Sequence, residues 1–332
     1  MCFLLGAKVT SIQHSSQGFR VTYRTTTDQS ISYPPSLFRR VGACGTLQAQ
    51  NVVLAVGKEG AVDAQPLASQ LGISSVPNRA CLGVRLEVRR SVVEHLVRST
   101  RDPKISMFVP SGIRVKTHCF GHPGEVLVTR YHGLPLAGGQ GVPGGRSCTS
   151  TFAVLVQDTG SSPWTYDLLA GMANRVKELG DSLASQTMGE FLRAHTDRSI
   201  PKGRFSPTLR PPAVRADIRG WLDELSLGEV VEEFLWRLSQ LAPGLLAPDH
   251  LVYFPAIEWW MPRLDTNDDM MTRIPGLYAV GDGAGLSQGI VQAAATGVVA
   301  ARAIVRRIEA ADRRPAVDEA AATRMEGATS GR

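Results

Sequence analysis

The chain has 332 residues, of which 43% are hydrophobic and 20% are charged. This composition excludes fibrous and intrinsically disordered classes and gives enough apolar surface for about two domains. Lys and Arg outnumber Asp and Glu by 36 to 30, and the resulting net charge of +6 permits an anionic ligand without requiring one.

The cysteines and the first residues indicate a cytoplasmic protein. The five cysteines form an odd set without a CxxC pair, so neither a disulfide framework nor a zinc ribbon is expected. Met1 to Lys8 lack the basic region and the long apolar run of a secretory signal. No run of about 18 apolar residues marks a membrane span. We therefore expect a reducing, cytoplasmic environment and no membrane partner.

The N-terminal part of the chain has the pattern of β-strands. In residues 1–26, Val9 and Ile12 close an apolar run before the turn at Gln17-Gly18, and apolar and polar residues alternate from Phe19 to Arg24 after it, which predicts a hairpin. A connection from Thr25 to Ser36 follows. Asn51 to Gly57 is a short, unbroken apolar run that ends in glycine, and it is typical of a buried parallel strand.

A mixed α/β pattern fills the middle of the chain between Gly83 and Phe254. Two stretches in it are rich in turn or basic residues, Gly133 to Gly145 and Arg193 to Arg219, and we expect both to be surface connections. The expected strands are Gly83–Val88, Ile105–Val109, Glu125–Thr129 and Thr151–Val156, and the expected helices are Trp164–Gly180 and Val230–Leu241.

The last part of the chain predicts a strand, a turn and a long helix. The strand covers Gly276 to Val280, the turn Gly281 to Gly285, and the helix runs from about Ser287 to Arg307, with a frayed tail after Ala310. One face of the helix is apolar and should pack on a core. Its residues are Ile290, Ala294, Val298, Ala301 and Val305.

The turn from Gly281 to Gly285 carries the most chemical information. A buried strand that ends in glycine lets a ligand approach the backbone, and the following helix directs N–H groups to the space above the strand. Asp282, at the tip of the strand, can accept hydrogen bonds from sugar-type hydroxyls. These features suit a nucleotide-bearing cofactor. They also suit an ordinary βα turn in which Asp282 caps the helix.

Three segments resemble FAD-dependent dehydrogenases of the glutathione-reductase-type FAD fold. Gly276 to Gly285, continued by Gln288 to Gly297 and Ala300-Ala301, is similar to the C-terminal FAD motif of these flavoproteins. Asn51 to Gly57 resembles the strand-Gly motif that closes the first half of their FAD domain. The segment from Leu71 to Glu87 resembles the passage into their substrate domain.

The resemblance implies an FAD-dependent oxidoreductase that transfers hydride through flavin N5 to or from a small-molecule substrate, with NAD(P)H as a candidate electron donor. Asp282 would bind a ribityl hydroxyl, Gly283 to Gly285 would approach the pyrophosphate and ribityl chain, and the helix start would lie near the pyrimidine edge of the flavin. No catalytic side chain is assigned. The implied cofactor-binding residues are Gly57, Gly281, Asp282, Gly283, Ala284, Gly285, Gly289 and Ile290.

The implied fold is an α/β FAD/NAD(P)-binding fold of the glutathione-reductase type, truncated at the N-terminus. Residues 1–83 and 256–310 would form its discontinuous FAD-binding domain, 84–255 an inserted mixed α/β substrate domain, and 311–332 a flexible tail. The family opens with a strand, a GxGxxG turn and a helix, and we find no such unit. Gly139 to Gly144 has the spacing but contains Pro143 and lacks the strand and helix context.

This departure leaves a second function open. The chain could be a non-catalytic fragment, or a subunit that needs a separate N-terminal segment or nucleotide-binding chain. An RNA-modifying flavoprotein that uses the Arg193 to Arg219 segment is a third reading, although the four prolines there favour a solvated linker and make nucleic acid an unexpected partner.

Two other clusters could have either a chemical role or a purely structural one. His118, Cys119 and His122 are metal-ligand types, but their spacing matches no zinc pattern, so we expect a loop, in which His118 or Cys119 could take part in proton transfer. Trp259 and Trp260 could flank a substrate or seal a domain interface.

Overall fold

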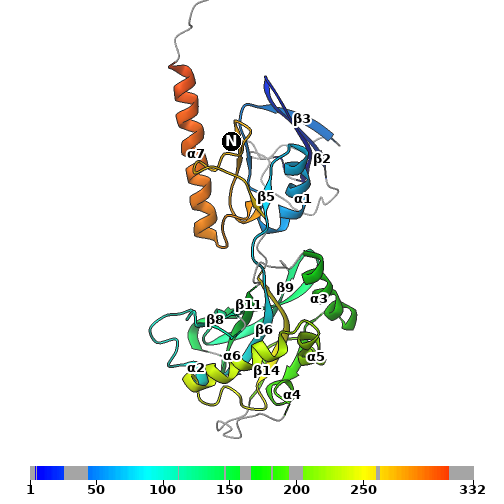
Figure 1. Cartoon of the computed structure of the whole chain (residues 1–332), viewed down its shortest axis with the longest axis vertical. Coiled ribbons are helices and arrows are strands. Elements are labelled where there is room, and N and C mark those ends of the chain that lie inside the picture. The colour runs from blue at the N-terminus through cyan, green and yellow to red at the C-terminus, as the bar shows by residue number, and fades with distance from the viewer. Residues whose placement is uncertain are drawn as a thin grey trace, which may run out of the picture. The chain divides into compact units, whose positions relative to one another are not determined.

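The chain divides into two compact units. The computed structural model describes residue 4 and residues 6–25, 44–110, 112–145, 147–157, 166–180, 182–193, 205–258 and 262–313. Unit 1 combines residues 1–77 with 261–332, and unit 2 is the segment 78–260 between them (Figure 1). The boundaries expected at 83/84 and 255/256 fall inside β6 (Cys81–Arg89) and β14 (Leu251–Glu258), which both lie in the main sheet of unit 2.

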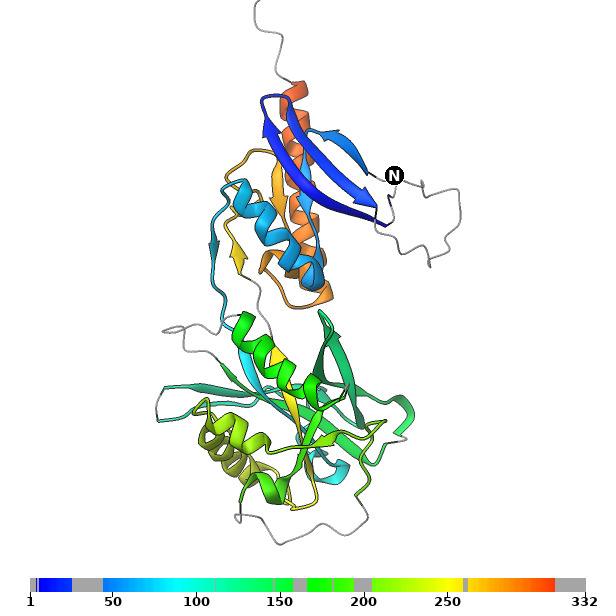
Figure 2. The same cartoon turned by 90° about the vertical axis from the view of Figure 1, so that its right-hand side faces the viewer.

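Unit 1 contains a three-stranded antiparallel sheet, a two-stranded parallel sheet and two long helices (Figure 2). The predicted hairpin is confirmed, because β1 and β2 pair across Gln17. The elements are β1 (Ala7–Ser15), β2 (Gly18–Thr25), β3 (Cys44–Ala49), β4 (Val52–Leu54), α1 (Gly57–Gln70), β5 (Ser75–Val76), β15 (Arg263–Leu264), β16 (Leu277–Ala279), the 3-10 turn η2 (Asp282–Ala284) and α7 (Ile290–Asp312).

The parallel pair of β4 and β16 lies between the two apolar clusters of unit 1. Leu277 pairs with Val52 and Ala279 with Leu54 in parallel, which confirms both predicted strands and the parallel type expected for Asn51 to Gly57. Alternate residues of a strand point to opposite faces. Leu277 and Ala279 therefore join the cluster that contains Phe19 and Leu54, whereas Tyr278 and Val280 join a second cluster with Ala300 and Ala303 of α7.

Unit 2 is built on a seven-stranded sheet in the order β13-β12-β14-β6-β11-β8-β7, so the mixed α/β class expected from the sequence is confirmed. β12 and β13 are parallel, and the other neighbouring strands are antiparallel. All residues of the central strand β6 are buried. A separate ribbon of β9 and β10 contributes Val126 and Ala137 to the core over Leu155 and Tyr253 of the sheet.

The remaining elements of unit 2 surround this sheet. They are α2 (Arg90–Val93), β7 (Ser106–Phe108), β8 (Arg114–Gly121), β9 (Gly124–Tyr131), β10 (Leu134–Gly141), η1 (Pro143–Gly145), β11 (Thr149–Gln157), α3 (Tyr166–Leu179), β12 (Ala184–Thr187), α4 (Met188–Phe191), β13 (Val214–Arg215), α5 (Ile218–Asp223) and α6 (Gly228–Leu241). None of the helices in the described part of the chain is long and apolar enough to cross a membrane.

Two predicted surface connections are wrong in part. The stretch from Gly133 to Gly145 contains the strand β10, whose glycines leave room for neighbouring side chains: a Cβ built on Gly139 would lie 2.3 Å from Nη1 of the buried Arg85. The stretch from Arg193 to Arg219 contains β13 and the start of α5, and Arg219 is buried because Asp223 and Glu232 neutralise its charge.

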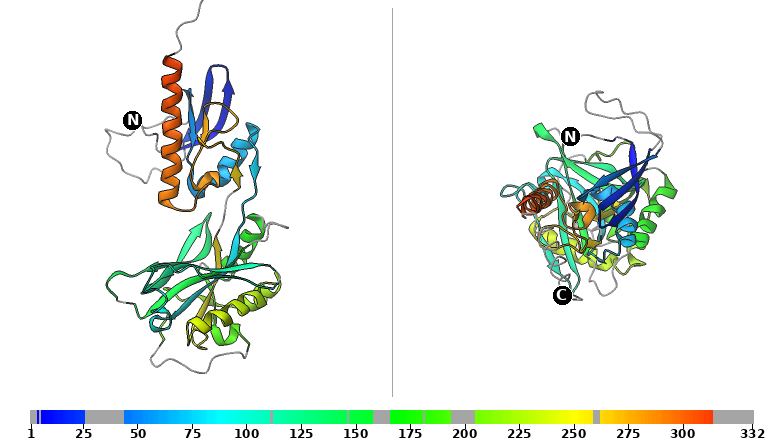
Figure 3. Two further views of the ribbon diagram at one scale, coloured as in Figure 1. Left: turned by 60° about the vertical axis from the view of Figure 1, so that its left-hand side comes forward. Right: turned by 90° about the horizontal axis from the view of Figure 1, so that it is seen from above.

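The orientation of α7 also differs from the prediction. Ala300 and Ala303 are its buried residues, whereas the predicted core face, which includes Val298 and Val305, is exposed to solvent. Figure 3 shows α7 running along one side of unit 1. The helix continues to Asp312, beyond the predicted end at Arg307, and the rest of the predicted tail, 314–332, lies outside the described residues.

His250 fixes a turn in unit 2 as a neutral side chain. Its Nδ1 donates to the carbonyl oxygen of Leu245 (2.8 Å), and its Nε2 accepts from the N–H of Arg89 (3.2 Å). Burial lowers the pKa of His250 from 6.5 to about 4. A proton on Nε2 would remove the acceptor and place an uncompensated charge in the core.

Stability should consequently fall with acid. The unfolded chain binds a proton near pH 6.5 and the folded chain only near pH 4, so the contribution of neutral His250 is complete above pH 6.5 and is lost as the pH falls to about 4. We expect a loss of about 3 kcal/mol from this group, measured by urea unfolding with tryptophan fluorescence. In His250→Asn, which does not titrate, the slope between pH 6.5 and 4 should be smaller; an unchanged slope would exclude His250 as its source.

Candidate functional site

The predicted cofactor residues gather where β4 and β16 end. The two strands are parallel, so their carboxyl ends lie at the same edge of the sheet. α1 begins at Gly57 directly after β4, and η2 and α7 follow β16; no side chain caps the N-terminus of α1 or of α7. The space outside the carboxyl ends of parallel strands, next to helix N-termini, is where α/β folds bind anionic and nucleotide ligands.

Glycine is needed at four of these positions, for two different reasons. Gly281 and Gly285 have φ angles of 71° and 70°, which L side chains rarely adopt. Gly283 lies against the start of α1, because a Cβ on it would be 2.5 Å from the carbonyl oxygen of Gly57. Gly57 has a φ of 65°, and no atom lies within 4 Å of the place its own Cβ would take. The backbone at this edge is therefore open to a close ligand.

Asp282 stands at the centre of the candidate site with one carboxylate oxygen in use. Its Oδ1 accepts from the hydroxyl of Ser287 (2.6 Å) and, more weakly, from the N–H of Gly289 (3.4 Å). Oδ2 receives no hydrogen bond from the described part of the chain, and the side chain is only partly buried. Asp282 thus holds the loop ahead of α7 with one oxygen and presents the other as an acceptor.

Gly289 and Ile290 are also brought to this edge, but in different ways. Gly289 is linked to Asp282 through its N–H, whereas Ile290 is 91% exposed and makes the first turn of α7 an apolar surface. The predicted set from Gly57 to Ile290 therefore surrounds one edge of one sheet. The buried Ala284 takes part through the core behind the loop.

Two residues of this site were not assigned by the sequence analysis. Thr296 accepts from the N–H of Gly281 (2.8 Å) and donates to the carbonyl oxygen of Ala293, so it ties the first turns of α7 to the end of β16. Ser287 orients Asp282. A hydroxyl residue shortly after the aspartate was the available signal for Ser287; the register that brings Thr296 to Gly281 depends on the path of the loop.

The cluster around His118 is a network of charged side chains on the sheet of unit 2. His118 lies in β8, not in the loop we expected, because β8 continues to Gly121. Lys104 Nζ donates to His118 Nδ1 (3.1 Å), Glu258 Oε1 lies 3.6 Å from His118 Nε2, and Lys116 pairs with Glu258 (2.5 Å). Burial lowers the pKa of His118; burial alone would raise the pKa of Glu258, but Lys116 and His118 hold it below its ordinary value.

Nothing in the described residues indicates a ligand at this network. The residues that the structure describes contain no group of three His, Cys, Asp or Glu side chains placed to hold a metal ion. Cys119 is an exposed residue with a free thiol, and partial desolvation of that thiol raises its pKa. The predicted role in proton transfer therefore stays a prediction.

The basic segment gives little support to nucleic-acid binding in its described part. Arg215 pairs with Glu190, Arg219 with Asp223 and Glu232, and Arg210 donates to the carbonyl oxygens of Pro207 and Leu209. Residues 194–204 and the pair Trp259 and Trp260 lie outside the described residues.

Compared with known protein families and with curated proteins, the chain matches none. The site geometry and the resemblance of its motifs are therefore the basis for a functional assignment.

Proposed function

We propose that the chain is an FAD-dependent oxidoreductase whose unit 1 has the glutathione-reductase-type FAD fold and binds the ribityl and pyrophosphate part of the cofactor. The observation that carries the proposal is the half-used carboxylate of Asp282 at the shared carboxyl edge of β4 and β16. This arrangement suits FAD because the ribityl chain supplies hydroxyl donors and the pyrophosphate supplies negative charge for helix N-termini.

The chain's own residues would bind and orient the cofactor. Asp282 Oδ2 would accept from a ribityl hydroxyl, Gly57 would leave room for the cofactor to approach the backbone, and Gly283 would let η2 pack closely against the start of α1. The N–H groups at the start of α7 would stabilise negative charge on the flavin. Bound FAD would supply hydride transfer, with NAD(P)H as the proposed donor and a small molecule as the proposed substrate.

The test is flavin affinity in variants of Asp282. Asp282→Asn keeps one oxygen that can accept from Ser287, but it replaces the free carboxylate oxygen with an amide NH2 group and removes the negative charge. We expect this variant to bind FAD about 10-fold more weakly. Asp282→Ala should weaken binding further, because the loop loses its anchor. Binding is measured by flavin fluorescence as FAD is added to the purified chain and its variants.

The matched control is Asp268→Ala, which removes an exposed carboxylate in the same unit. It should leave FAD affinity unchanged. If the wild-type chain binds FAD and both Asp282 variants bind it equally well, Asp282 is only a structural residue of a βα turn, and the flavin site has to be abandoned.

A further inference from the structure

Three arginines are buried in the part of the chain that the structure describes, and they differ in their partners. Arg89 and Arg219 each form ion pairs with acidic side chains of unit 2. Arg85 is only 4% exposed, yet it forms no ion pair with a described carboxylate. Moving a charge out of water without a counter-charge is costly, so Arg85 differs from an ordinary structural arginine.

The guanidinium of Arg85 is bound by neutral acceptors through two of its three nitrogens. Nε donates to the carbonyl oxygen of Ala137 in β10 (2.9 Å). Nη1 donates to the carbonyl oxygen of Cys119 in β8 and to the hydroxyl of Thr151 in β11 (both 3.2 Å). Nη2 retains contact with solvent and donates to no acceptor among the described residues. It is therefore free to bind the acceptor of a ligand.

The guanidinium lies at an irregularity of β8. Cys119 and Phe120 together face the single residue Phe152 of β11, so β8 carries a β-bulge. Cys119 is exposed, and its carbonyl oxygen is the one that holds Nη1. The charged group of Arg85 consequently lies directly behind an exposed residue, close to the surface, although nearly all of the side chain is buried.

The surroundings of Arg85 hold its side chain in place and leave it charged. A Cβ on Gly139 of β10 would lie 2.3 Å from Nη1, so glycine leaves the space that the guanidinium fills. Burial lowers the pKa of Arg85 from 12.5 to about 10, which still leaves it positively charged at neutral pH. A cross-link from β6 to β8 and β10 needs only a neutral N–H donor. The structural contacts therefore account for the position of Arg85 but not for its charge.

The charged network around His118 does not supply a counter-charge for Arg85, because each lysine of that network has a carboxylate of its own. Among these described side chains, only the charge of Arg85 is left over, and one negative charge would balance it. The pairs of the network are Lys104 with Asp102 (2.7 Å) and Lys116 with Glu258 (2.5 Å).

We propose that unit 2 binds the carboxylate group of a small molecule at the bulge of β8, with Nη2 of Arg85 as the donor that pairs with a carboxylate oxygen. A carboxylate fits better than a phosphate, because one free nitrogen and one uncompensated charge match a monoanion, whereas a phosphate dianion needs further donors. The inference goes beyond the proposed function, because it concerns unit 2 and holds whether or not unit 1 binds FAD.

The test is an NMR titration of the isotope-labelled chain, without FAD, with sodium acetate and sodium benzoate at an ionic strength held constant by sodium chloride. We expect the side-chain N–H signals of Arg85 and the backbone amide signals of Cys119 and Phe120 to shift and to saturate. Sodium phosphate, titrated in the same way, should bind at least about 10-fold more weakly.

Arg85→Met removes the charge and the donors but keeps a long side chain that suits a core. It should weaken binding at least about 10-fold, as judged from the amides of Cys119 and Phe120. The matched control is Arg114→Met, which removes the same charge from an exposed position of β8 and should bind both carboxylates as wild type does. If Arg85→Met does not fold, the Arg85 signals of the wild-type chain still locate the bound carboxylate.

Three results would overturn the proposal: no saturable shift with acetate or benzoate, equal binding of phosphate, or shifts that Arg85→Met leaves in place. Arg85 would then serve only as a cross-link of β6 to β8 and β10. A chain that binds carboxylates but not FAD would refute the flavin site alone, so the two proposals fail separately.

Discussion

Gly83→Ala should unfold unit 2. Gly83 is the third residue of β6, the central strand of the sheet, where it pairs with Leu155 of β11 and Ala256 of β14. A Cβ on Gly83 would lie 2.0 Å from the carbonyl oxygen of Val154 and 3.0 Å from the Cα of Leu155. These are backbone atoms held on both sides by other strands, so the clash cannot be relieved by turning a side chain.

We expect this variant to lose about 4 kcal/mol or more of the free energy of unfolding, at the upper end of single substitutions. Trp221 and Trp236 lie in α5 and α6, so tryptophan fluorescence during urea unfolding follows unit 2.

The matched control is Gly171→Ala in α3, where nothing lies within 4 Å of the new Cβ. It should stabilise unit 2 by about 0.5–1 kcal/mol, because alanine is the better helix former. A Gly83→Ala variant as stable as wild type would mean that β6 and β11 are not paired in the register described here.

The local elements of unit 1 could be predicted because their signals are local. The turn at Gln17-Gly18 and the period-two alternation that follows it indicate the β1–β2 hairpin, and an apolar run ended by glycine indicates β4 and β16. The turn after β16 was predictable for the same reason, because the positive φ angles at Gly281 and Gly285 require glycine, and glycine is visible in the sequence. The ligand of the turn cannot be predicted from such local patterns.

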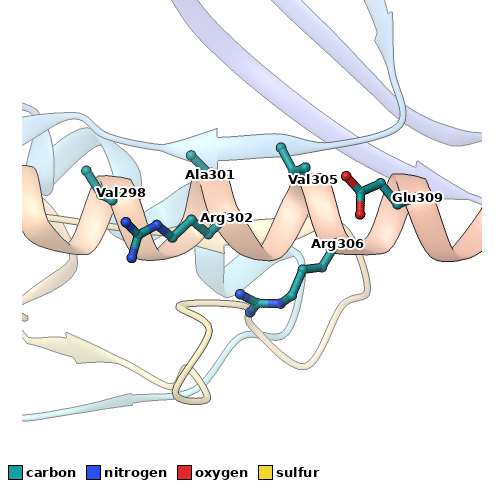
Figure 4. A pocket seen from close by; sticks show the side chains of 6 residues that line it. All are labelled: Val298, Ala301, Arg302, Val305, Arg306 and Glu309. Atoms are coloured by element: carbon teal, nitrogen blue, oxygen red, sulfur yellow. The ribbon is translucent and has the colours of Figure 1, made fainter.

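Burial was harder to predict because it depends on what lies next to an element. The stripe on α7 that includes Val298 and Val305 satisfies the sequence rule for a core face, but the helix packs on unit 1 through Ala300 and Ala303. Periodicity alone therefore did not distinguish the side of α7 that packs on unit 1 from a second apolar side that the described residues leave exposed (Figure 4).

Long-range pairing in unit 2 gave no sequence signal either. The glycines from Gly138 to Gly141 suggested a loop, although the first two are needed inside β10, where Thr129 and Arg85 occupy the space of their side chains. Likewise, the pairing of Lys116 with Glu258 joins residues 142 positions apart. Only the order β14-β6-β11-β8 brings them together.

Gly283→Ala should disrupt the candidate site while it leaves unit 2 folded. The new Cβ would lie 2.5 Å from the carbonyl oxygen of Gly57 and 2.6 Å from Cγ2 of Val56, so η2 and the start of α1 would have to separate. We expect a loss of about 2–4 kcal/mol in the free energy of unfolding of unit 1, followed by far-UV circular dichroism. Tryptophan fluorescence should show the transition of unit 2 unchanged.

The same variant should lose FAD binding if the cofactor lies at this edge, since the backbone could no longer approach it from both strands. Gly297→Ala in α7 is the matched control: it adds a methyl group to the same unit with nothing within 4 Å, so it should bind FAD as wild type does and be slightly more stable. If Gly283→Ala were destabilised but bound FAD normally, the close approach of Gly283 and Gly57 would serve packing alone, and the flavin would have to lie elsewhere.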